Sequence, residues 1–287
     1  MVDPFLFGPA GRDTDDASNL LAYFADHPSV GLHDTFSDVE VPDNEPSLAL
    51  IATRTADMPA VFRDVIQAGF KNIYLEKPGA STVEELEEMR ELAAVAGVNV
   101  AMGYNKNVAE YVTEARLFAA SRPGSDTKFI HMNAVPHTDA DLGECFERNS
   151  EGMLKNQMIH ELTLMSTFYG VTVDTIASVE ALDVVYHEKI GPSGASYRDF
   201  SRVGFTVVTK DGQRISAQGD RCAGNYSSAE VSLGGAIALE TRVPSESHSL
   251  VMDRLESEAP GCAPYFFLQD PEYIVLKERF AAHILEV

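Results

Sequence analysis

Basic residues are scarce in this sequence: 22 lysines and arginines stand against 44 aspartates and glutamates, a formal net charge of −22. Such a surface repels nucleic-acid phosphates and anionic lipid, so neither is an expected partner. No apolar run approaches the ~20 residues that span a bilayer. Residues 1–13 also lack the basic-then-apolar pattern of a secretory signal. We therefore expect an acidic cytoplasmic protein.

Cysteine is also scarce, and none of the three cysteines forms a C-x-x-C pair with another. Neither a zinc knuckle nor a disulfide framework is predicted from such wide, odd-numbered spacing. His131 and His137 flank an expected strand-to-loop transition, but no other ligand stands at metal-binding spacing around them. No metal site is expected.

The chain is organised around residues 48–80, which hold two short apolar runs at 48–52 and 72–75 with a helical run at 58–68 between them. Apolar runs with little alternation are typical of strands covered on both faces. A strand–helix–strand unit of this kind predicts a parallel sheet. Glu76-Lys77-Pro78 follows the second strand, at the edge where open α/β sheets bind ligands. Lys77 is therefore the first candidate site residue.

The same pattern continues to about residue 123. Ser81-x-x-Glu84 predicts a capping box that opens a helix over 82–96, and residues 99–102 read as another buried strand. A polar cluster, Tyr104-Asn105-Lys106-Asn107, follows that strand and precedes a helix expected over 108–120. The cluster is a candidate ligand site, although Asn107 as a helix N-cap would explain part of it equally well.

The second half changes character. A strand over 128–135 and about 15 residues of loop precede a helix predicted over 152–169, which carries Asn156 and His160 one turn apart. Strand patterns without intervening helices follow, and they predict an antiparallel sheet in a separate domain. The expected domains are residues 1–123 and 124–287. The expected strands cover residues 178–186, 202–209, 214–220, 230–233 and 236–241, and a final helix covers 272–285.

This order of motifs resembles the glucose–fructose oxidoreductase / inositol dehydrogenase / MocA family. The matching motifs are Glu76-Lys77-Pro78, the cluster at 104–107 and His160, and they cover roughly residues 36–170. Phe36-Ser37-Asp38-Val39 resembles the segment before the family's third strand. The resemblance implies an α/β plus α+β protein, in which a Rossmann-like parallel-sheet domain precedes a domain with a largely antiparallel open sheet. It also implies NAD or NADP as cofactor and a homo-oligomer formed through the second sheet.

The chain departs from the family in two places. Residues 4–7 align best with the family's second strand, so the Rossmann-like domain is expected to be incomplete, without the first strand and the G-x-G-x-x-G turn. Gly8, Gly11 and Arg12 offer a weaker phosphate contact, because glycine lets backbone approach a phosphate and arginine can bind it. The family's Asp-x-Gly-x-His-x-x-Asp pattern reads Asn156, Met158, His160 and Thr163 here. We therefore expect the chain as given to bind dinucleotide weakly.

The resemblance assigns roles residue by residue. Lys77 and His160 are the expected catalytic pair, with Lys77 donating to the substrate oxygen and His160 accepting the proton. The expected substrate contacts are Tyr104, Asn105, Lys106, Lys155 and Asn156. The expected cofactor contacts are Thr53, Glu76, Lys77 and Pro78.

Simpler structural interpretations exist for the same residues. Lys77 could be a solvated residue at a strand end, His160 a hydrogen-bonded core residue, and Lys155 a surface residue. Three functions follow from the pattern. The first is an NAD(P)-dependent oxidoreductase acting on a sugar, polyol or similar hydroxylated small molecule. The second is a ligand-binding or partner protein without cofactor chemistry, and the third is an acid–base isomerase or lyase.

Overall fold

The structure, a computed structural model, describes residues 2, 31–33, 35–36, 39–42, 45–133, 138–258 and 270–286. The chain divides into two compact units, Met1–Met102 with Ile284–Val287, and Gly103–His283. The segment between the two predicted strands at 99–102 and 128–135 belongs to the second unit, because α4 (Glu110–Ala120) packs on strands β8 (Tyr226–Leu233) and β9 (Ala236–Val243) of that unit's sheet.

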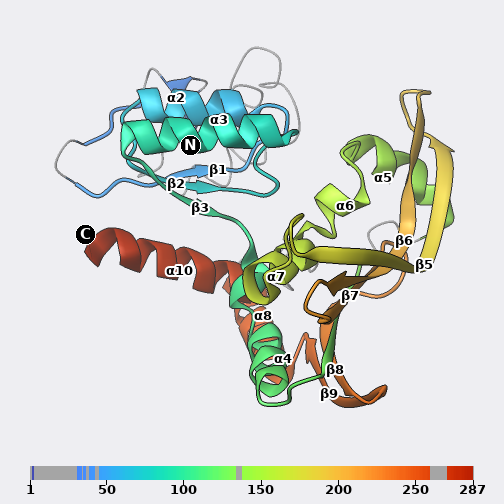
Figure 1. The fold of residues 1–287 in the computed structure, drawn as a ribbon. Helices are drawn as coiled ribbons and strands as arrows, with labels where there is room; N and C mark the ends of the chain where they lie inside the picture. The colour runs from blue at the N-terminus through green and yellow to red at the C-terminus, as the bar shows by residue number, and fades with distance from the viewer. Residues whose placement is uncertain are drawn as a thin grey trace. The chain divides into compact units, whose positions relative to one another are not determined.

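The first unit is built around a three-stranded parallel sheet in the order β1-β2-β3. Figure 1 shows the two connecting helices side by side on one face of this sheet. The parallel sheet and its connecting helices confirm the prediction from residues 48–102. The elements are β1 (Ala49–Ile51), α2 (Met58–Gln67), β2 (Asn72–Leu75), α3 (Val83–Ala96) and β3 (Asn99–Met102).

Burial within this sheet is uneven. All four residues of β2 are buried, as its unbroken apolar run predicts, whereas every residue of β3 is exposed or half-buried. The expectation that β3 is a buried strand is therefore wrong, because β3 lies at the edge of the three-stranded sheet. Phe62 and Val65 of α2 and Met89 of α3 close the core over β2.

The capping box of α3 stands one residue later than the sequence pattern suggested. Thr82, not Ser81, is the N-cap: its hydroxyl accepts from the backbone N–H of Glu85 at 3.2 Å. The Glu85 carboxylate in turn accepts from the N–H groups of Ser81 and Thr82. Glu84 and Glu85 both follow a hydroxyl residue at the right spacing, so the sequence alone could not choose between the two registers.

The second unit contains a six-stranded sheet in the order β5-β6-β7-β4-β8-β9. Neighbouring strands are antiparallel except for β4 and β7, which are parallel. The sheet confirms the expected antiparallel second domain and adds one parallel pair to it. Its strands are β4 (Asp126–Met132), β5 (Ile176–Ile190), β6 (Ser196–Thr209), β7 (Arg214–Asp220), β8 (Tyr226–Leu233) and β9 (Ala236–Val243).

The helices of the second unit differ from the predicted ones in several places, one of which is the unpredicted helix α8 (Glu246–Glu258). The helix expected over 152–169 is broken into α6 (Met153–Asn156) and α7 (Ile159–Tyr169). The polar loop expected before it contains a short helix, α5 (Leu142–Arg148), whose apolar residues Leu142 and Phe146 are buried. The helix expected from Val108 begins at Glu110, after the 3-10 turn η2 (Asn105–Val108).

Asn107 is therefore not a helix N-cap, because Ala109 occupies that position for α4.

Two further helices, α8 (Glu246–Glu258) and α10 (Asp270–Glu286), follow the sheet along the chain. In the part of the chain that the structure describes, no helix combines the length and apolar character needed to cross a membrane.

Candidate functional site

The Glu76-Lys77-Pro78 segment stands directly after β2, at the carboxyl edge of the parallel sheet. Backbone hydrogen bonding continues to Glu76, whose N–H donates to the carbonyl of Ile51 at 2.9 Å. The Tyr74 hydroxyl donates to the Glu76 carboxylate at 3.2 Å, which fixes that side chain locally. Lys77 is half-buried and Pro78 is buried. The arrangement holds Lys77 at the end of a rigid strand, where a ligand of an open α/β sheet binds.

The other expected cofactor contacts are Thr53 and the group Gly8, Gly11 and Arg12. Thr53, after β1, is exposed, and its hydroxyl makes one long contact of 3.5 Å to the neighbouring carbonyl of Arg54. Gly8, Gly11 and Arg12 lie outside the described residues.

The polar cluster at 104–107 belongs to the second unit, where η2 packs against α7. Asn105 and Lys106 are 2% and 5% exposed, far less than expected for residues at a loop. The Asn105 Oδ1 atom is buried and has no hydrogen-bond partner among the described residues. A buried amide oxygen without a partner costs free energy, which indicates that a water molecule or ligand group satisfies it.

Glu161 is the centre of a buried charge cluster that no sequence motif singled out. Its Oε1 atom accepts from Lys106 Nζ at 2.5 Å, and its Oε2 atom lies 3.3 Å from His131 Nδ1. All three side chains are less than 10% exposed. A buried carboxylate of this kind is tolerated only because it is paired on both oxygens.

The ionisation of Glu161 follows from these contacts. Burial alone would raise the pKa of the Glu161 carboxyl, but the Lys106 ammonium and then the His131 side chain outweigh it and hold that pKa well below its ordinary value. Glu161 is therefore a carboxylate at neutral pH. It fixes the side chains of Lys106 and His131 from two different segments of the chain.

His160, the expected proton acceptor, stands next to Glu161 at the start of α7 and is 4% exposed. Its ring meets two other rings edge-on, with centroids 6.4 Å from Tyr104 and 6.2 Å from His131. Burial raises the pKa of the Tyr104 phenol, while a hydrogen bond with Thr163 opposes that shift. The structure thus brings His160, Tyr104, Asn105 and Lys106 into one polar cluster.

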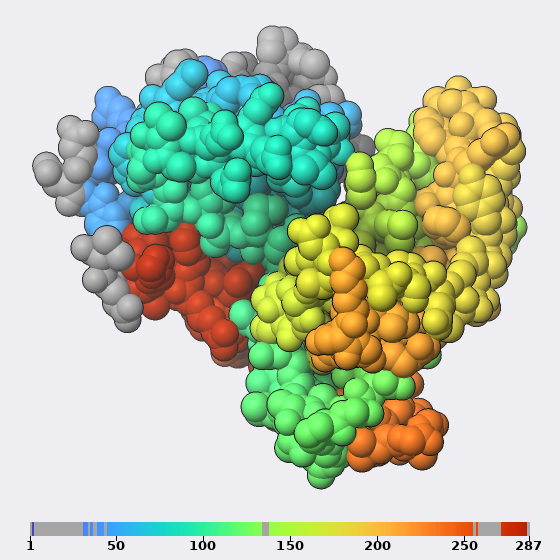
Figure 2. Space-filling model, viewed as in Figure 1, coloured from blue at the N-terminus to red at the C-terminus, as the bar shows by residue number. Residues whose placement is uncertain are grey.

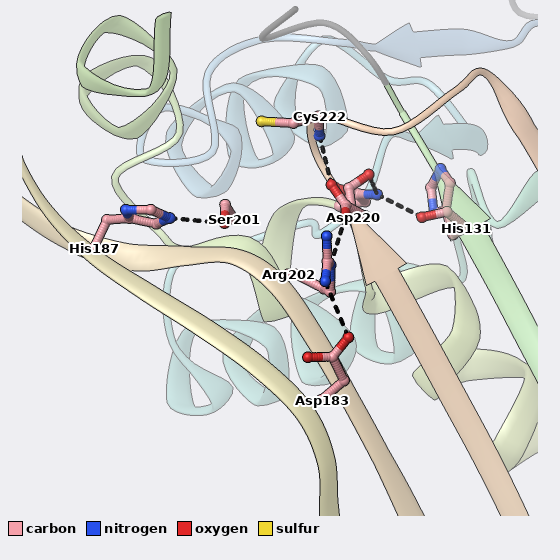
Figure 3. A network of polar contacts seen from close by, with 8 residues as sticks. His131, Asp183, His187, Ser201, Arg202, Asp220 and Cys222 are labelled. Carbon is pink, nitrogen blue, oxygen red and sulfur yellow. Dashed lines mark hydrogen bonds and ion pairs between the residues drawn. The ribbon is translucent and has the colours of Figure 1, made fainter. Parts of the chain in front are cut away.

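Gln157, in the break between α6 and α7, connects this cluster to the end of the sheet. Its amide Nε2 donates to the backbone carbonyls of His131 at 2.9 Å and Asp220 at 3.4 Å. Figure 3 shows the continuation: the Asp220 carboxylate accepts from Arg202 Nε at 2.6 Å and from the backbone N–H of Cys222 at 2.7 Å. These bonds hold the ends of β4 and β7 together and thereby fix the His131 backbone.

A small pocket of about 40 Å³ lies beside the cluster. Its polar lining includes Asn105, Lys106, His131 and, from α10, Glu272. A volume of this size holds about two or three water molecules. The pocket is therefore a place for ordered water beside the cluster.

The last two expected substrate contacts stand apart from the charge cluster. Lys155 is exposed on α6, and Asn156 is half-buried at the end of α6, where its amide donates to Glu151 at 3.4 Å. Because the chain breaks at Gln157 and Met158, Asn156 and His160 do not share one continuous helix face as the sequence suggested.

The sequence patterns did not assign a site role to Glu161, His131 or Gln157. For Glu161 alone, the sequence held a hint of its role. Glu161 is a carboxylate in the apolar run Ile159–Met165, where most neighbours face the core. A charge inside such a run must be paired. A buried partner could have been inferred, but its identity required knowing that η2 and β4 pack against α7.

Residues 15–104 match the model of the glucose–fructose oxidoreductase / inositol dehydrogenase / MocA family, described as an oxidoreductase family with an NAD-binding Rossmann fold. No curated protein matches the chain in sequence.

Solved structures of three dehydrogenases share the fold at low identity. A myo-inositol dehydrogenase from Corynebacterium glutamicum has 16% identity and a TM-score of 0.65, covering 99% of this chain and 79% of its own. An apo scyllo-inositol dehydrogenase from Lactobacillus casei has 14% identity and a TM-score of 0.64, covering 95% and 78%. A myo-inositol 2-dehydrogenase from Lactobacillus plantarum has 17% identity and a TM-score of 0.58, covering 80% and 66%.

Fold and site together define a two-domain protein, with a parallel Rossmann-like sheet followed by a mostly antiparallel sheet. The resemblance to the glucose–fructose oxidoreductase / inositol dehydrogenase / MocA family is confirmed by the family match over residues 15–104. The solved structures support the fold over nearly the whole chain.

Proposed function

We propose that the chain is an NAD(P)-dependent oxidoreductase acting on a polyol, sugar or similar hydroxylated small molecule. The observation that carries the proposal is the match of residues 15–104 to an NAD-binding oxidoreductase family, within which Glu76-Lys77-Pro78 follows β2. The carboxyl edge of a parallel sheet, with a half-buried lysine held at it, fits a nicotinamide cofactor. When bound, that cofactor accepts or donates the hydride.

The chain's own residues would handle the proton. Lys77 is proposed to hydrogen-bond the substrate oxygen, because a half-buried ammonium donates strongly to a developing alkoxide. His160 is proposed to accept the hydroxyl proton, since a neutral imidazole is the usual side-chain base near neutral pH. The proposed substrate contacts remain Tyr104, Asn105, Lys106, Lys155 and Asn156. Lys106 would act through the N–H groups that Glu161 does not occupy.

Cofactor binding is the first test. Titrating the full chain with NADH and NADPH, and following cofactor fluorescence, should give saturable binding of one or both.

Substrate turnover is the second test, with myo-inositol and other polyols as probes. Lys77→Met should abolish turnover, while Lys210→Met, at the exposed β6–β7 turn, should leave it unchanged. Wild-type turnover that survives Lys77→Met would overturn the role of Lys77.

A second function is favoured by one specific observation. Asn156 and Thr163 stand where the family often has aspartates, and neither an amide nor a hydroxyl serves as a base near neutral pH. A ligand-binding or partner protein, or an acid–base isomerase or lyase using Lys77 and His160, would need no nicotinamide. Polyol binding by calorimetry without any NADH or NADPH binding would favour this alternative.

The proposal includes a homo-oligomer formed through the second sheet. β5 is an edge strand with large apolar side chains exposed along it, among them Val179, Leu182, Tyr186 and Ile190 at 54% or more. Figure 2 shows β5 and β6 as yellow and gold atoms on the surface. An exposed apolar edge strand is a place for association. Light scattering should show a multimer, which Leu182→Glu with Tyr186→Glu should weaken.

A cytoplasmic location is also proposed, from the composition and the charge. Cell fractionation tests it, and recovery in the membrane or secreted fraction would count against it.

A further inference from the structure

The second unit contains a larger cleft that the proposed function does not use. It encloses about 610 Å³ and lies where the end of α4, the loop after it, the end of α7 and the β6–β7 turn meet. This volume falls within the range of about 300–1,000 Å³ that is typical of small-molecule sites. Three arginines line it, Arg116, Arg122 and Arg214. Such a concentration of positive charge is notable in a chain with a net charge of −22.

Arg116 forms no hydrogen bond or ion pair with a carboxylate among the described residues. Its charge acts on the nearby Tyr169 phenol, where it opposes the rise in pKa that burial causes. The Arg116 Cζ atom lies 3.5 Å from the centre of the Phe168 ring, so the guanidinium lies against that ring. The side chain is half-buried. Stacking leaves the N–H groups along the guanidinium edge available, and these form the fork that binds oxyanions.

Arg122, just after the end of α4, repeats the arrangement. Its Cζ atom lies 3.6 Å from the centre of the Phe118 ring. Nη1 donates to the Ser121 hydroxyl at 2.6 Å and to the Phe118 carbonyl at 3.4 Å, and no carboxylate pairs with it among the described residues. Its remaining N–H groups are available to a ligand.

The third arginine of the cleft is already paired, because Arg214 donates to the Glu180 carboxylate at 2.9 Å. Two aspartates also line the cleft: the Asp211 carboxylate accepts from the Thr209 hydroxyl, and Asp126 is exposed. Arg116 and Arg122 are therefore the guanidinium groups of this cleft that form no ion pair with a carboxylate among the described residues.

We propose that this cleft binds the oxyanion group, carboxylate or phosphate, of a small molecule, held by Arg116 and Arg122. The two guanidinium groups are pre-oriented by Phe168 and Phe118, so less side-chain freedom is lost on binding. Each can form charge-assisted hydrogen bonds, which are roughly twice as strong as neutral ones. The proposal is independent of the oxidoreductase function.

Isothermal calorimetry on the full chain, with inorganic phosphate and with citrate as separate probes, tests this and distinguishes the two oxyanions. Direct binding is the proper readout, because phosphate also raises the stability of folded proteins by exclusion from their surfaces. Arg116→Gln with Arg122→Gln should weaken binding about 10-fold or more. The matched control, Arg148→Gln with Arg198→Gln, removes the same charge from two exposed arginines elsewhere and should leave binding within about twofold of wild type.

A second double variant, with lysine in place of both arginines, tests whether charge alone is enough for binding. It also replaces the glutamine variant if that variant folds poorly. Arg116→Lys with Arg122→Lys keeps both charges but loses the planar fork, so binding should fall between those of wild type and the glutamine variant. Failure of wild type to bind either probe would overturn the proposal. Equal loss of binding in the control variant would do the same, because it would show a response to net charge alone.

Discussion

The ammonium of Lys106 lies 2.5 Å from the carboxylate of Glu161, although the two residues are 55 positions apart and both are buried. The contact joins η2, which follows the parallel sheet along the chain, to α7, which carries His160. His131 of β4 binds the second oxygen of the same carboxylate. Three segments of the second unit are thus held by one side chain beside the expected proton acceptor.

Glu161→Gln should strongly destabilise the protein. The substitution leaves the Lys106 ammonium buried without its counter-charge, and breaking one side of a buried pair typically costs about 3–5 kcal/mol. Urea unfolding of the full chain measures the change. Glu144→Gln is the matched control, because Glu144 pairs with Arg148 on the surface, where such pairs contribute about 0.5 kcal/mol or less. A Glu161→Gln variant as stable as the control would contradict the assigned role of the cluster.

Much of the fold could be predicted because local pattern and tertiary structure agree. The limits of β2, β3 and β7 were predicted to the residue, since glycine or proline stands within a few positions of each end of these runs. The helix break at Gln157 was not predictable from periodicity. The break accompanies tertiary contacts, because the Gln157 amide donates to backbone carbonyls on β4 and β7. The local sequence around Gln157 does not indicate these contacts.

The candidate site was predictable only in part, for the same reason. The residue types at Lys106 and His160 indicated polar chemistry, but not that a buried carboxylate already engages Lys106. Burial also limits the chemistry of Lys106, because a buried lysine that is paired with a carboxylate contributes mainly to the structure. Whether Lys77 and His160 act on one substrate stays a prediction, which the turnover of their variants tests.

The capping box of α3 gives a sharp test of register. Glu85→Ala should lower the unfolding free energy by about 0.5–1 kcal/mol, because the Glu85 carboxylate accepts from the N–H groups of Ser81 and Thr82 and alanine cannot. Glu84→Ala should cost less, because it removes only a charge from the same first turn. Chemical denaturation of both variants makes the comparison. A larger loss for Glu84→Ala would place the box at Ser81 after all.

Gly143 in α5 should not tolerate a side chain. A Cβ atom there would stand 2.3 Å from the backbone carbonyl oxygen of Ile190, and a backbone atom cannot yield as a flexible side chain does. Gly143→Ala should therefore destabilise by about 1–3 kcal/mol, as overpacking does. Gly204→Ala is the control, since its added Cβ would meet neighbours at an ordinary 3.5 Å. Equal stability of the two variants in thermal unfolding would contradict the close approach of α5 to the end of β5.

His248 predicts a pH-dependent contribution to stability. Its Nε2 atom lies 2.8 Å from the Glu272 carboxylate, and both side chains are 7% exposed. The contact joins α8 to α10. The hydrogen bond with Glu272 raises the pKa of His248, against the opposing effect of burial.

The sign of the effect follows from that direction. A histidine whose pKa is higher in the folded than in the unfolded state binds protons more tightly when folded, so stability falls as pH rises. The stabilisation is fully present below the unfolded pKa of about 6.5 and is lost as pH passes through the raised folded value. Glu272→Gln should lower the unfolding free energy more at about pH 5.5 than at about pH 9, because it removes the charge that favours the imidazolium. Urea unfolding of wild type and variant at the two pH values measures the difference, and a larger loss at the higher pH would show that His248 is held neutral in the folded protein.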